Sequence, residues 1–380
     1  MRILHTLPGL NWGGMELRAL EQTRWLLDHG HDAVLAAPPD GEPAARARAA
    51  GLPFEPAVFD HPYAPSSVLG LRGLVRRHRI QVIDAHGGRD GKTAAACLGL
   101  CAVVRDRHIT QPLRSSFTRR LQWRLGCDHV VAVAETIRDR LLEGGLADPA
   151  RISVIGEWAE DRFFAPRPSV DQRRALRASL GLAEGAFVVA AVAMLRPDKG
   201  HDVLIRAMAR MRAGGVDAAC LLVGSATTEG ADHVEALRRL AAELGLGEHV
   251  VFAGYRTDVP EVMAAADALA VPSLVNEGQS RVVPQAFALA LPVVASAIGG
   301  LPELVRPGET GWLTPPHDSE SLARALMELA TDRPLAERIA ANARRFAEAH
   351  LGFDGKMRET LDVYEAARAR AARRGATFAG

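Results

Sequence analysis

The chain has 380 residues, of which 48% are hydrophobic and 24% are charged, and its formal net charge is +1. This length exceeds one hydrophobic core, so we expect two domains, and the composition excludes a disordered or fibrous chain. The near-neutral total charge points to no partner, and we expect no nucleic-acid binding.

The first residues, MRILHTLPG, are typical of a short strand and a turn rather than of a secretory signal. The longest apolar run, residues 94–104, is shorter than the roughly 20 residues that a membrane-spanning helix needs. The four cysteines form no C-x-x-C pair, which fits a reduced compartment. We therefore expect a cytoplasmic protein, with any membrane contact peripheral at the inner face of the membrane.

Short runs rich in Val, Ile and Leu alternate with longer helical patterns, which is typical of βαβ units around a parallel sheet. In the first half, strands are predicted over residues 2–7, 32–37, 81–86, 101–106, 129–134 and 151–156, and helices over 16–30 and 136–145. In the second half, strands are predicted over 187–194, 218–224, 249–254, 268–273 and 292–297, and helices over 201–215, 234–246 and 321–332. We predict an α/β protein with two doubly wound Rossmann-like domains facing a central cleft.

Residues 161–170 carry two prolines between a predicted strand and a predicted helix, which indicates a linker. We therefore expect an N-terminal domain over 1–165 and a C-terminal domain over 166–355, followed by a helix within 356–380. Folds of this kind bind ligands at the carboxyl ends of their strands, so the loops after strands are where function is expected.

Two of these loops carry glycines or cations. Gly13 and Gly14 follow the first strand and precede a helix, where glycines admit a ligand close to the backbone and leave N–H groups for an anion. The spacing is not a complete G-x-G-x-x-G, which argues against a dinucleotide. Arg196 and Lys199 follow the strand 187–194, and they are either a diphosphate site or a solvated basic turn.

A third loop, residues 274–280, leads into a helical turn with Pro284. Ser280 is the expected N-cap, and Glu277 lies just before this helix start. A carboxylate next to a phosphate is costly unless it binds neutral hydroxyls or a developing cation, which favours a sugar ligand. The chain has no D-x-D motif and no metal-ligand spacing, so we expect metal-independent chemistry without a cofactor.

Taken together, these motifs resemble the family-4 retaining glycosyltransferases of the GT-B fold, over nearly the whole chain. The resemblance rests on the Gly13–Gly14 loop and on residues 196–205, 221–225, 249–255, 271–305 and 306–316. It implies transfer of a hexosyl or N-acetylhexosaminyl group from a nucleotide-sugar such as a UDP-sugar or GDP-mannose, with retention. It also implies an acceptor-side N-terminal domain, a nucleotide-sugar-binding C-terminal domain and a C-terminal helix that crosses back to the first domain.

The resemblance also implies roles for single residues. Glu277 corresponds to the first glutamate of the family's E-x7-E motif, which reaches sugar hydroxyls, and Lys199 would neutralise the departing diphosphate. His108 matches a family histidine near the transferred sugar. The backbone N–H groups that would hold phosphate and sugar belong to Gly278, Gln279 and Ser280.

Two positions depart from the family pattern. Met194 replaces the usual arginine, so Arg196 would reach the phosphates from a displaced position. Gln285 stands where the second glutamate binds the ribose diol, and its amide accepts one hydrogen bond and donates another. We interpret this as a working donor site with altered ribose contacts. Because no enzymic nucleophile is evident, we expect same-face attack by the acceptor.

Charge is uneven along the chain. Residues 71–124 contain twelve Arg or Lys and three Asp, a local charge of +9 that suits a phosphorylated acceptor or an anionic membrane surface. Within this segment, 113–125 has Leu113, Phe117, Leu121 and Leu125 on one helical stripe, which is either an interfacial helix or a helix packed on its sheet. The loop after strand 81–86 offers His86, Arg89 and Lys92 to the acceptor side.

The acceptor is expected to be a glycan or a lipid-linked molecule of the cell envelope, as in the biosynthesis of lipopolysaccharide and related polysaccharides. Two other functions stay open: a non-catalytic sugar-nucleotide-binding scaffold protein and a GT-B-type sugar-nucleotide epimerase. An NAD-dependent enzyme is least favoured, because neither half carries the glycine fingerprint with its acidic partner.

Overall fold

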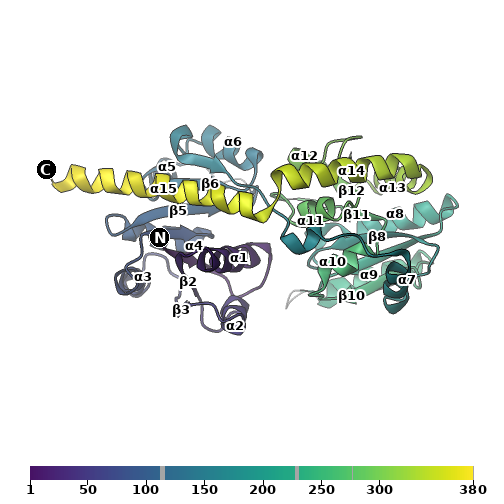
Figure 1. Ribbon diagram of the computed structural model, residues 1–380, viewed down its shortest axis with the longest axis horizontal. Coiled ribbons are helices and arrows are strands. Elements are labelled where there is room, and N and C mark those ends of the chain that lie inside the picture. Colours follow the sequence, from purple (N-terminus) through teal and green to yellow (C-terminus); the bar gives the residue numbers. More distant parts are fainter. Residues whose placement is uncertain (112–115, 227–230, 276, 380) are drawn as a thin grey trace. The chain divides into compact units, whose positions relative to one another are not determined.

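The structure of the chain is a computed structural model. It describes residues 1–111, 116–226, 231–275 and 277–379, with the side chains of the last helix described as far as Arg374. The chain divides into two compact units, Met1–Gly156 together with Asp354–Gly380, and Glu157–Phe353. Each unit contains one sheet with helices packed against it (Figure 1).

The N-terminal unit is built on a seven-stranded sheet in the order β3-β2-β1-β4-β5-β6-β7, and all of its strand pairs are parallel. Its strands are β1 (Arg2–Thr6), β2 (Asp32–Ala37), β3 (Phe54–Pro56), β4 (Val82–Ala85), β5 (Ala102–Arg107), β6 (His129–Ala132) and β7 (Ile152–Val154). Its helices are α1 (Gly14–Asp28), α2 (Glu42–Ala49), α3 (Pro65–Arg77), α4 (Gly88–Ala94), α5 (Phe117–Leu125), α6 (Glu135–Glu143) and α15 (Phe353–Ala379).

The last helix, α15, packs on this N-terminal unit although it is the end of the chain (Figure 1). Trp25 on α1 donates its indole N–H to Asp354, with 2.7 Å between Nε1 and Oδ1. Tyr364 and Ala367 are fully buried. Helix α15 is therefore part of the core of the unit rather than a loose tail.

The second unit is built on a six-stranded sheet in the order β10-β9-β8-β11-β12-β13, again parallel throughout. Its strands are β8 (Phe187–Val192), β9 (Ala218–Val223), β10 (Val250–Gly254), β11 (Ala268–Val271), β12 (Val293–Ser296) and β13 (Gly311–Thr314). Its helices are α7 (Val170–Ser179), α8 (His201–Ala213), α9 (Ala231–Glu243), α10 (Val259–Ala264), α11 (Val282–Ala288), α12 (Leu301–Leu304), α13 (Ser319–Thr331) and α14 (Arg333–His350).

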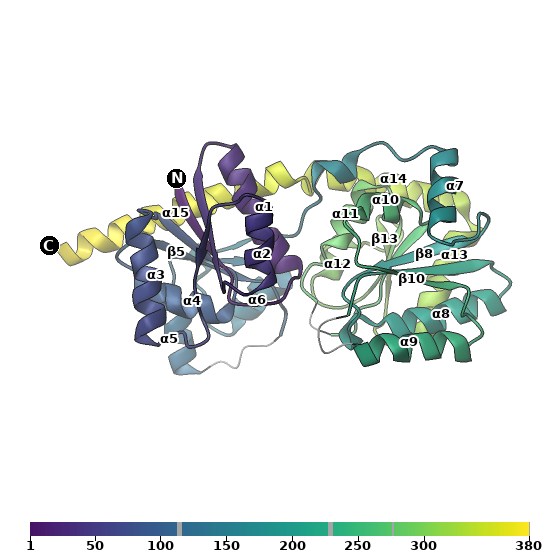
Figure 2. The same cartoon turned by 90° about the horizontal axis from the view of Figure 1, so that it is seen from below.

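Both faces of this second sheet are covered by helices. Val188 of β8 joins a core with residues of α10, α11 and α14, and the next residue, Val189, joins a core with residues of α8, α9 and α13. Figure 2 shows α8 and α9 on one side of the sheet and α10 and α11 on the other. Because successive side chains of a strand point to opposite faces, a strand covered on both sides is apolar throughout, as the sequence indicated.

The expected α/β fold with parallel sheets is confirmed, and every predicted strand is present. Two strands, β3 and β13, were not predicted. Strand β3 has three residues and ends in Pro56, and β13 is a four-residue strand within a Gly- and Pro-rich segment, so neither has a long apolar run.

The units divide between Gly156 and Glu157, upstream of the boundary expected near residue 165. Ala159 and Phe163 are fully buried in the core of the second unit. Trp158 stacks on Phe353, with 5.0 Å between ring centroids. Residues 161–164 thus form a short 3-10 helix that belongs to the second unit.

No helix in the described part of the chain is both long enough and apolar enough to cross a lipid bilayer.

One glycine of the second unit is required by its surroundings. Gly200, between Lys199 and α8, has a φ of +67°, and a Cβ there would lie 2.0 Å from the Pro272 carbonyl oxygen. Gly181 is a matched control, because its φ is +72° and nothing lies within 4 Å of its Cβ position. We expect Gly181→Ala to lower the free energy of unfolding by about 1 kcal/mol, from the left-handed backbone alone.

The overlap with Pro272 adds to that cost in Gly200→Ala, so a loss of about 3 kcal/mol or more is expected there. Urea unfolding of the two variants measures the difference, and equal losses would contradict the close packing of these loops.

Candidate functional site

The loops after β8 and β11 bring Lys199 and Glu277 together in the second unit. Lys199 Nζ lies 2.7 Å from Glu277 Oε2, and Ser273 Oγ donates to the same oxygen at 2.7 Å. The side chain of Glu277 is only 10% exposed, and that of Lys199 is 21% exposed. A charge-assisted contact at this depth holds both side chains in one position.

The sheet topology explains this pairing. Strands β8 and β11 are parallel neighbours, so the loops that follow them leave the same edge of the sheet. The Leu274 N–H donates to the Asp198 carbonyl oxygen at 2.9 Å, which ties the two loops together. The left-handed turn at Gly200 then starts α8 directly after Lys199.

Arg196 lies in the same loop but is engaged by an acidic neighbour. Its Nε and Nη2 bond both carboxylate oxygens of Asp198, at 2.8 and 2.5 Å, and this contact raises the pKa of Arg196. The guanidinium is therefore held by Asp198. That Arg196 contacts phosphates from this position stays a prediction.

The segment Gly278–Ser280 lies just before the start of α11. In the described residues, the backbone N–H groups of Gly278, Gln279 and Ser280 donate to no other group of the chain. The side chain of Gln279 accepts from the Glu157 N–H and donates to Glu303, both at 3.0 Å. The expectation that Ser280 caps the helix is wrong, because α11 begins at Val282 without a side-chain cap.

Gln285 is buried, and a carboxylate lies beside it. Its Nε2 donates to Glu160 Oε2 at 3.1 Å, and Arg281 lies 3.3 Å from the other oxygen of Glu160. Glu160 was not among the residues expected at the site. Glu160 lies just before the predicted linker and belongs to no sequence motif. Its contact with Gln285 is therefore evident only from the structure.

In the N-terminal unit, the Gly13–Gly14 turn starts α1. Gly13 is the N-cap in extended conformation, and its carbonyl oxygen accepts the Leu17 N–H at 3.0 Å. Glu16 in the first turn is only 8% exposed, and burial raises its pKa. The helix predicted over residues 16–30 is confirmed, and it begins at Gly14.

Three residues at the ends of β4 and β5 form a buried cluster. Asp106 Oδ2 lies 3.3 Å from His86 Nδ1 and 3.6 Å from His108 Nε2. The side chain of His108 is 11% exposed and that of His86 is fully buried. Because it is fully buried, His86 cannot contact a ligand directly. His108 is the partly exposed member of the cluster.

His and Asp side chains also bind metal ions, and two groups of three lie close enough to do so: His5, Asp84 and His86, and His86, Asp106 and His108. Burial alone would lower the pKa of His86, but Asp84 and Asp106 raise it to about 9. A protonated imidazole has no lone pair for a metal. Ion pairing of His86 with these carboxylates therefore competes with metal binding.

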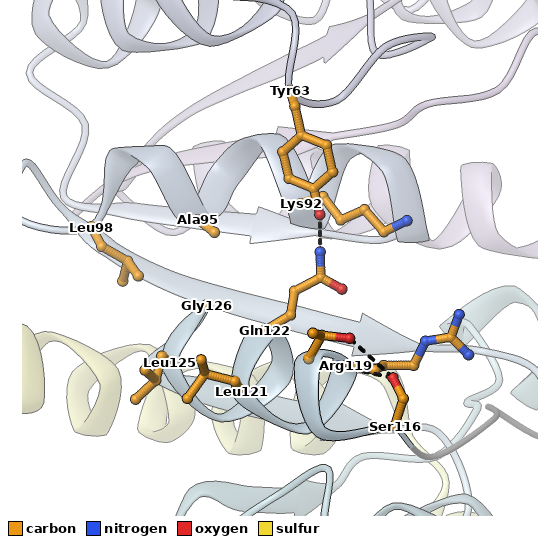
Figure 3. Close-up of a pocket in the computed structure, with 11 residues that line it drawn as sticks. Tyr63, Lys92, Ala95, Leu98, Ser116, Arg119, Leu121, Gln122, Leu125 and Gly126 are labelled. Atoms are coloured by element: carbon orange, nitrogen blue, oxygen red, sulfur yellow. Dashed lines mark hydrogen bonds between the residues drawn. The ribbon is translucent and has the colours of Figure 1, made fainter.

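The two basic residues of α4 lie in different surroundings. Arg89 donates to Asp60 at 3.2 Å and to the Pro8 carbonyl oxygen at 2.9 Å. Lys92 lines a groove of about 620 Å³ between α4 and α5 (Figure 3). The opposite wall of this groove carries Arg119 and Gln122, and the amide of Gln122 donates to the hydroxyl of Tyr63. The groove is thus polar near Lys92 and apolar along Leu121 and Leu125.

Helix α5 turns its apolar stripe outward. Phe117, Leu121 and Leu125 are 80%, 48% and 63% exposed, whereas Trp123 is 6% exposed and packs under the guanidinium of Arg105. The interpretation in which this stripe packs on the sheet is therefore wrong, because Trp123 is the residue that attaches the helix. Leu113 and Arg114, which the predicted helix included, lie outside the described residues.

The contact between Gln285 and Glu160 predicts the effect of restoring a glutamate. In Gln285→Glu two carboxylates face each other, so we expect a loss of about 1–3 kcal/mol in the free energy of unfolding at pH 8. The loss should be smaller at pH 5, where one carboxylate takes up a proton more readily. Thermal unfolding at both pH values measures it.

Gln172→Glu is the matched control. The Gln172 side chain only accepts a hydrogen bond, from the Ser169 N–H at 2.8 Å, and a carboxylate accepts it equally well. The same loss of stability in both variants would contradict the assigned contact.

Comparison with known families matches both units. The family model described as "Glycosyltransferase Family 4" matches residues 12–157, and the one described as "Glycosyl transferases group 1" matches residues 172–346. The D-inositol 3-phosphate glycosyltransferase of Stackebrandtia nassauensis is 37% identical over 218 residues, which are 55% of this chain and 48% of that protein. The chain spans about half the length of the curated relatives it matches.

Solved structures cover nearly the whole chain. A glycosyltransferase from Rickettsia africae superposes with a TM-score of 0.86 at 19% identity, over 96% of this chain and 98% of that one, which shows the fold. Anabaena Alr3699/HepE in complex with UDP-glucose superposes with a TM-score of 0.81 at 27% identity, over 95% and 99% of the two chains. With a family model matched in each of its two units, the chain belongs to the family-4 glycosyltransferases of the GT-B fold.

Proposed function

We propose that this chain transfers a sugar from a nucleotide-diphospho-sugar to a glycan or a lipid-linked acceptor of the cell envelope, with retention of anomeric configuration. The observation that carries the proposal is the Lys199–Glu277 pair at the ends of two neighbouring strands. In this proposal the cation of the pair binds the diphosphate, and the carboxylate beside it binds sugar hydroxyls. Membership of the glycosyltransferase family supports the same reaction class.

The donor side is proposed as follows. Lys199 neutralises the leaving diphosphate, and Glu277 accepts hydrogen bonds from the sugar. In the described residues the N–H groups of Gly278, Gln279 and Ser280 have no acceptor, and they suit phosphate oxygens. The related Anabaena protein was solved with UDP-glucose, which makes that compound the first donor to test.

The chemistry is proposed to need no metal, because Lys199 supplies positive charge where the leaving group develops negative charge. The ribose contact is proposed to involve Gln285, whose amide is oriented by Glu160. The acceptor would attack on the face from which the diphosphate departs. A glycosyl-enzyme trapped on any carboxylate would contradict this mechanism.

The acceptor is proposed to be anionic. Residues 71–124 carry an excess of +9, and several curated relatives are named for inositol 3-phosphate, a phosphorylated polyol. The exposed stripe of α5, with Arg120 and Arg124 exposed beside it, suits the surface of an anionic membrane. An anionic acceptor that is attached to a lipid would suit both the basic segment and the exposed stripe of α5.

Isothermal calorimetry with UDP, GDP, ADP and their common sugar conjugates tests the donor site. We expect one nucleotide to bind, its sugar conjugate to be hydrolysed slowly, and Lys199→Ala to weaken binding by about tenfold or more. Glu277→Ala should abolish hydrolysis. Lys356→Ala, which removes a Lys–Glu pair on α15, is the control and should change neither.

The outcomes separate the remaining functions. Binding without any turnover, with or without an acceptor, would favour a sugar-nucleotide-binding scaffold protein. Conversion of the donor to an isomer would favour an epimerase. Absence of binding by every nucleotide would contradict the donor site.

The exposed stripe of α5 predicts lipid binding. In flotation assays with vesicles containing an anionic lipid, we expect the wild type to float and the triple variant Phe117→Ser, Leu121→Ser, Leu125→Ser to stay in the lower fraction. Val170→Ser, at a residue that is 76% exposed in the other unit, should float like the wild type. Equal flotation of all three proteins, or of none, would contradict a membrane role for α5.

A further inference from the structure

The groove between α4 and α5 is not part of the proposed donor site. Its volume is about 620 Å³, which is within the range of pockets that bind small organic molecules. Its walls come from α4, from the turn that follows α4 and from α5, so it lies within the N-terminal unit (Figure 3). None of the three residues His86, Asp106 and His108 lines it. The groove is therefore separate from that buried cluster.

The two ends of the groove differ in their chemistry. Figure 3 shows the amine of Lys92 and the guanidinium of Arg119 on one side of Gln122. The side chains of Leu98 and Leu125 lie on the other side of Gln122. A ligand that fills the groove would therefore meet positive charge at one end and aliphatic carbon at the other.

The polar end of the groove suits an anion. Lys92 is half-buried, and among the described residues its amine has neither a hydrogen bond nor an ion pair. None of the described residues that line the groove is acidic. A partly buried cation without a counter-ion favours the binding of an anion, and the planar guanidinium of Arg119 matches the oxygens of a phosphate. The charges at this end therefore favour a phosphate group.

The apolar end of the groove is open to solvent. Leu121 is 48% exposed and Leu125 is 63% exposed, and both line the groove from α5. Leu98 on the opposite wall is half-buried. An exposed apolar patch with a polar rim is typical of a binding site, because covering it removes apolar surface from water. A ligand with an aliphatic chain would cover these leucines.

This apolar end is continuous with the exposed stripe of α5. Leu121 and Leu125 belong to both, and Phe117, which is 80% exposed, lies one turn earlier on the same helix. The residues that are proposed to contact a membrane therefore also form a wall of the groove. This continuity favours a lipid of the bilayer as the occupant of the groove.

We propose that the groove binds one anionic phospholipid molecule, with its phosphate against Lys92 and Arg119 and part of an acyl chain along Leu98, Leu121 and Leu125. A free sugar phosphate would leave the leucines exposed to water, and an uncharged lipid would leave Lys92 without a counter-ion. The inference rests on the proposed membrane contact of α5 only for the source of the lipid. It does not depend on the donor site.

Calorimetry with short-chain lipids tests the groove without a membrane. Dihexanoyl phosphatidylglycerol, kept below its critical micelle concentration, should bind with one molecule per chain. Dihexanoyl phosphatidylcholine has the same acyl chains but a zwitterionic headgroup, so its affinity should be at least about tenfold lower. Glycerol 3-phosphate carries the phosphate without the acyl chains, and its affinity should be lower by at least about the same factor. Each comparison removes one half of the proposed recognition.

Two variants of Lys92 test the phosphate contact. Lys92→Met removes the charge and keeps most of the side-chain length, so it should lower the affinity for phosphatidylglycerol by about tenfold and leave that for phosphatidylcholine unchanged. Lys92→Glu reverses the charge and should lower the affinity for phosphatidylglycerol further. Arg206→Met is the control, because Arg206 is exposed on α8 of the other unit and its side chain has no hydrogen bond or ion pair among the described residues. It should change neither affinity.

A second pair of variants tests the contact with the acyl chain. Leu125→Ser should weaken the binding of phosphatidylglycerol but not that of glycerol 3-phosphate, because only the lipid covers this side chain. Leu69→Ser is the matched control, since Leu69 is 66% exposed in the same unit but does not line the groove. It should bind both compounds like the wild type. Thermal unfolding checks that every variant is folded.

Equal affinities of the wild type for the anionic and the zwitterionic lipid would overturn the proposal. Binding of phosphatidylglycerol by Lys92→Met or by Leu125→Ser that is as tight as in the matched control would also overturn it. If the wild type floats with anionic vesicles but binds no short-chain lipid, the membrane contact of α5 stands and the lipid site in the groove is wrong. Nucleotide binding is measured separately, so a failure of the donor site would not be mistaken for a failure of the groove.

Discussion

Parallel strand pairing is the constraint on which the candidate site depends. Since all strands in each sheet run in one direction, their carboxyl ends lie along one edge, and the following loops are gathered there. In the second unit this brings Lys199, after β8, to Glu277, after β11. In the N-terminal unit it brings His86 and His108, after β4 and β5, to one carboxylate of β5. Residues far apart in sequence become neighbours through strand order alone.

The charges at these edges are paired before any ligand arrives. Glu277 bonds Lys199, Asp198 bonds Arg196, and Glu160 holds the amide of Gln285. Pairing fixes each side chain in one position, which reduces the reorganisation needed when charge develops in a reaction. It also means that a diphosphate would compete with Glu277 for Lys199. In the proposed function, a sugar next to the diphosphate would resolve this competition, because its hydroxyls would give Glu277 new donors.

Much of the fold was predictable, because buried parallel strands such as residues 187–194 are long apolar runs. Two features could not be predicted: α11 begins after Ser280 without a side-chain cap, and the apolar stripe of α5 faces outward. Both depend on tertiary contacts, such as that of Trp123 with Arg105, which a sequence pattern does not contain. The buried cluster of His86, Asp106 and His108 did leave a signal in the sequence. The motif Asp-x-His occurs at the end of both β4 and β5, as Asp84 with His86 and as Asp106 with His108. Alternation in a strand puts both members of each pair on one face.

The most direct test of the account is the anomer of the sugar first released when the protein hydrolyses the nucleotide-sugar that it binds, with UDP-glucose tried first. Proton NMR reads the anomeric configuration before mutarotation mixes the two forms. A retaining site centred on Lys199 and Glu277 predicts that the α-anomer of glucose appears first and that Lys199→Ala releases almost none. First release of the β-anomer would contradict retention. Equal release by Lys199→Ala would contradict the donor site itself.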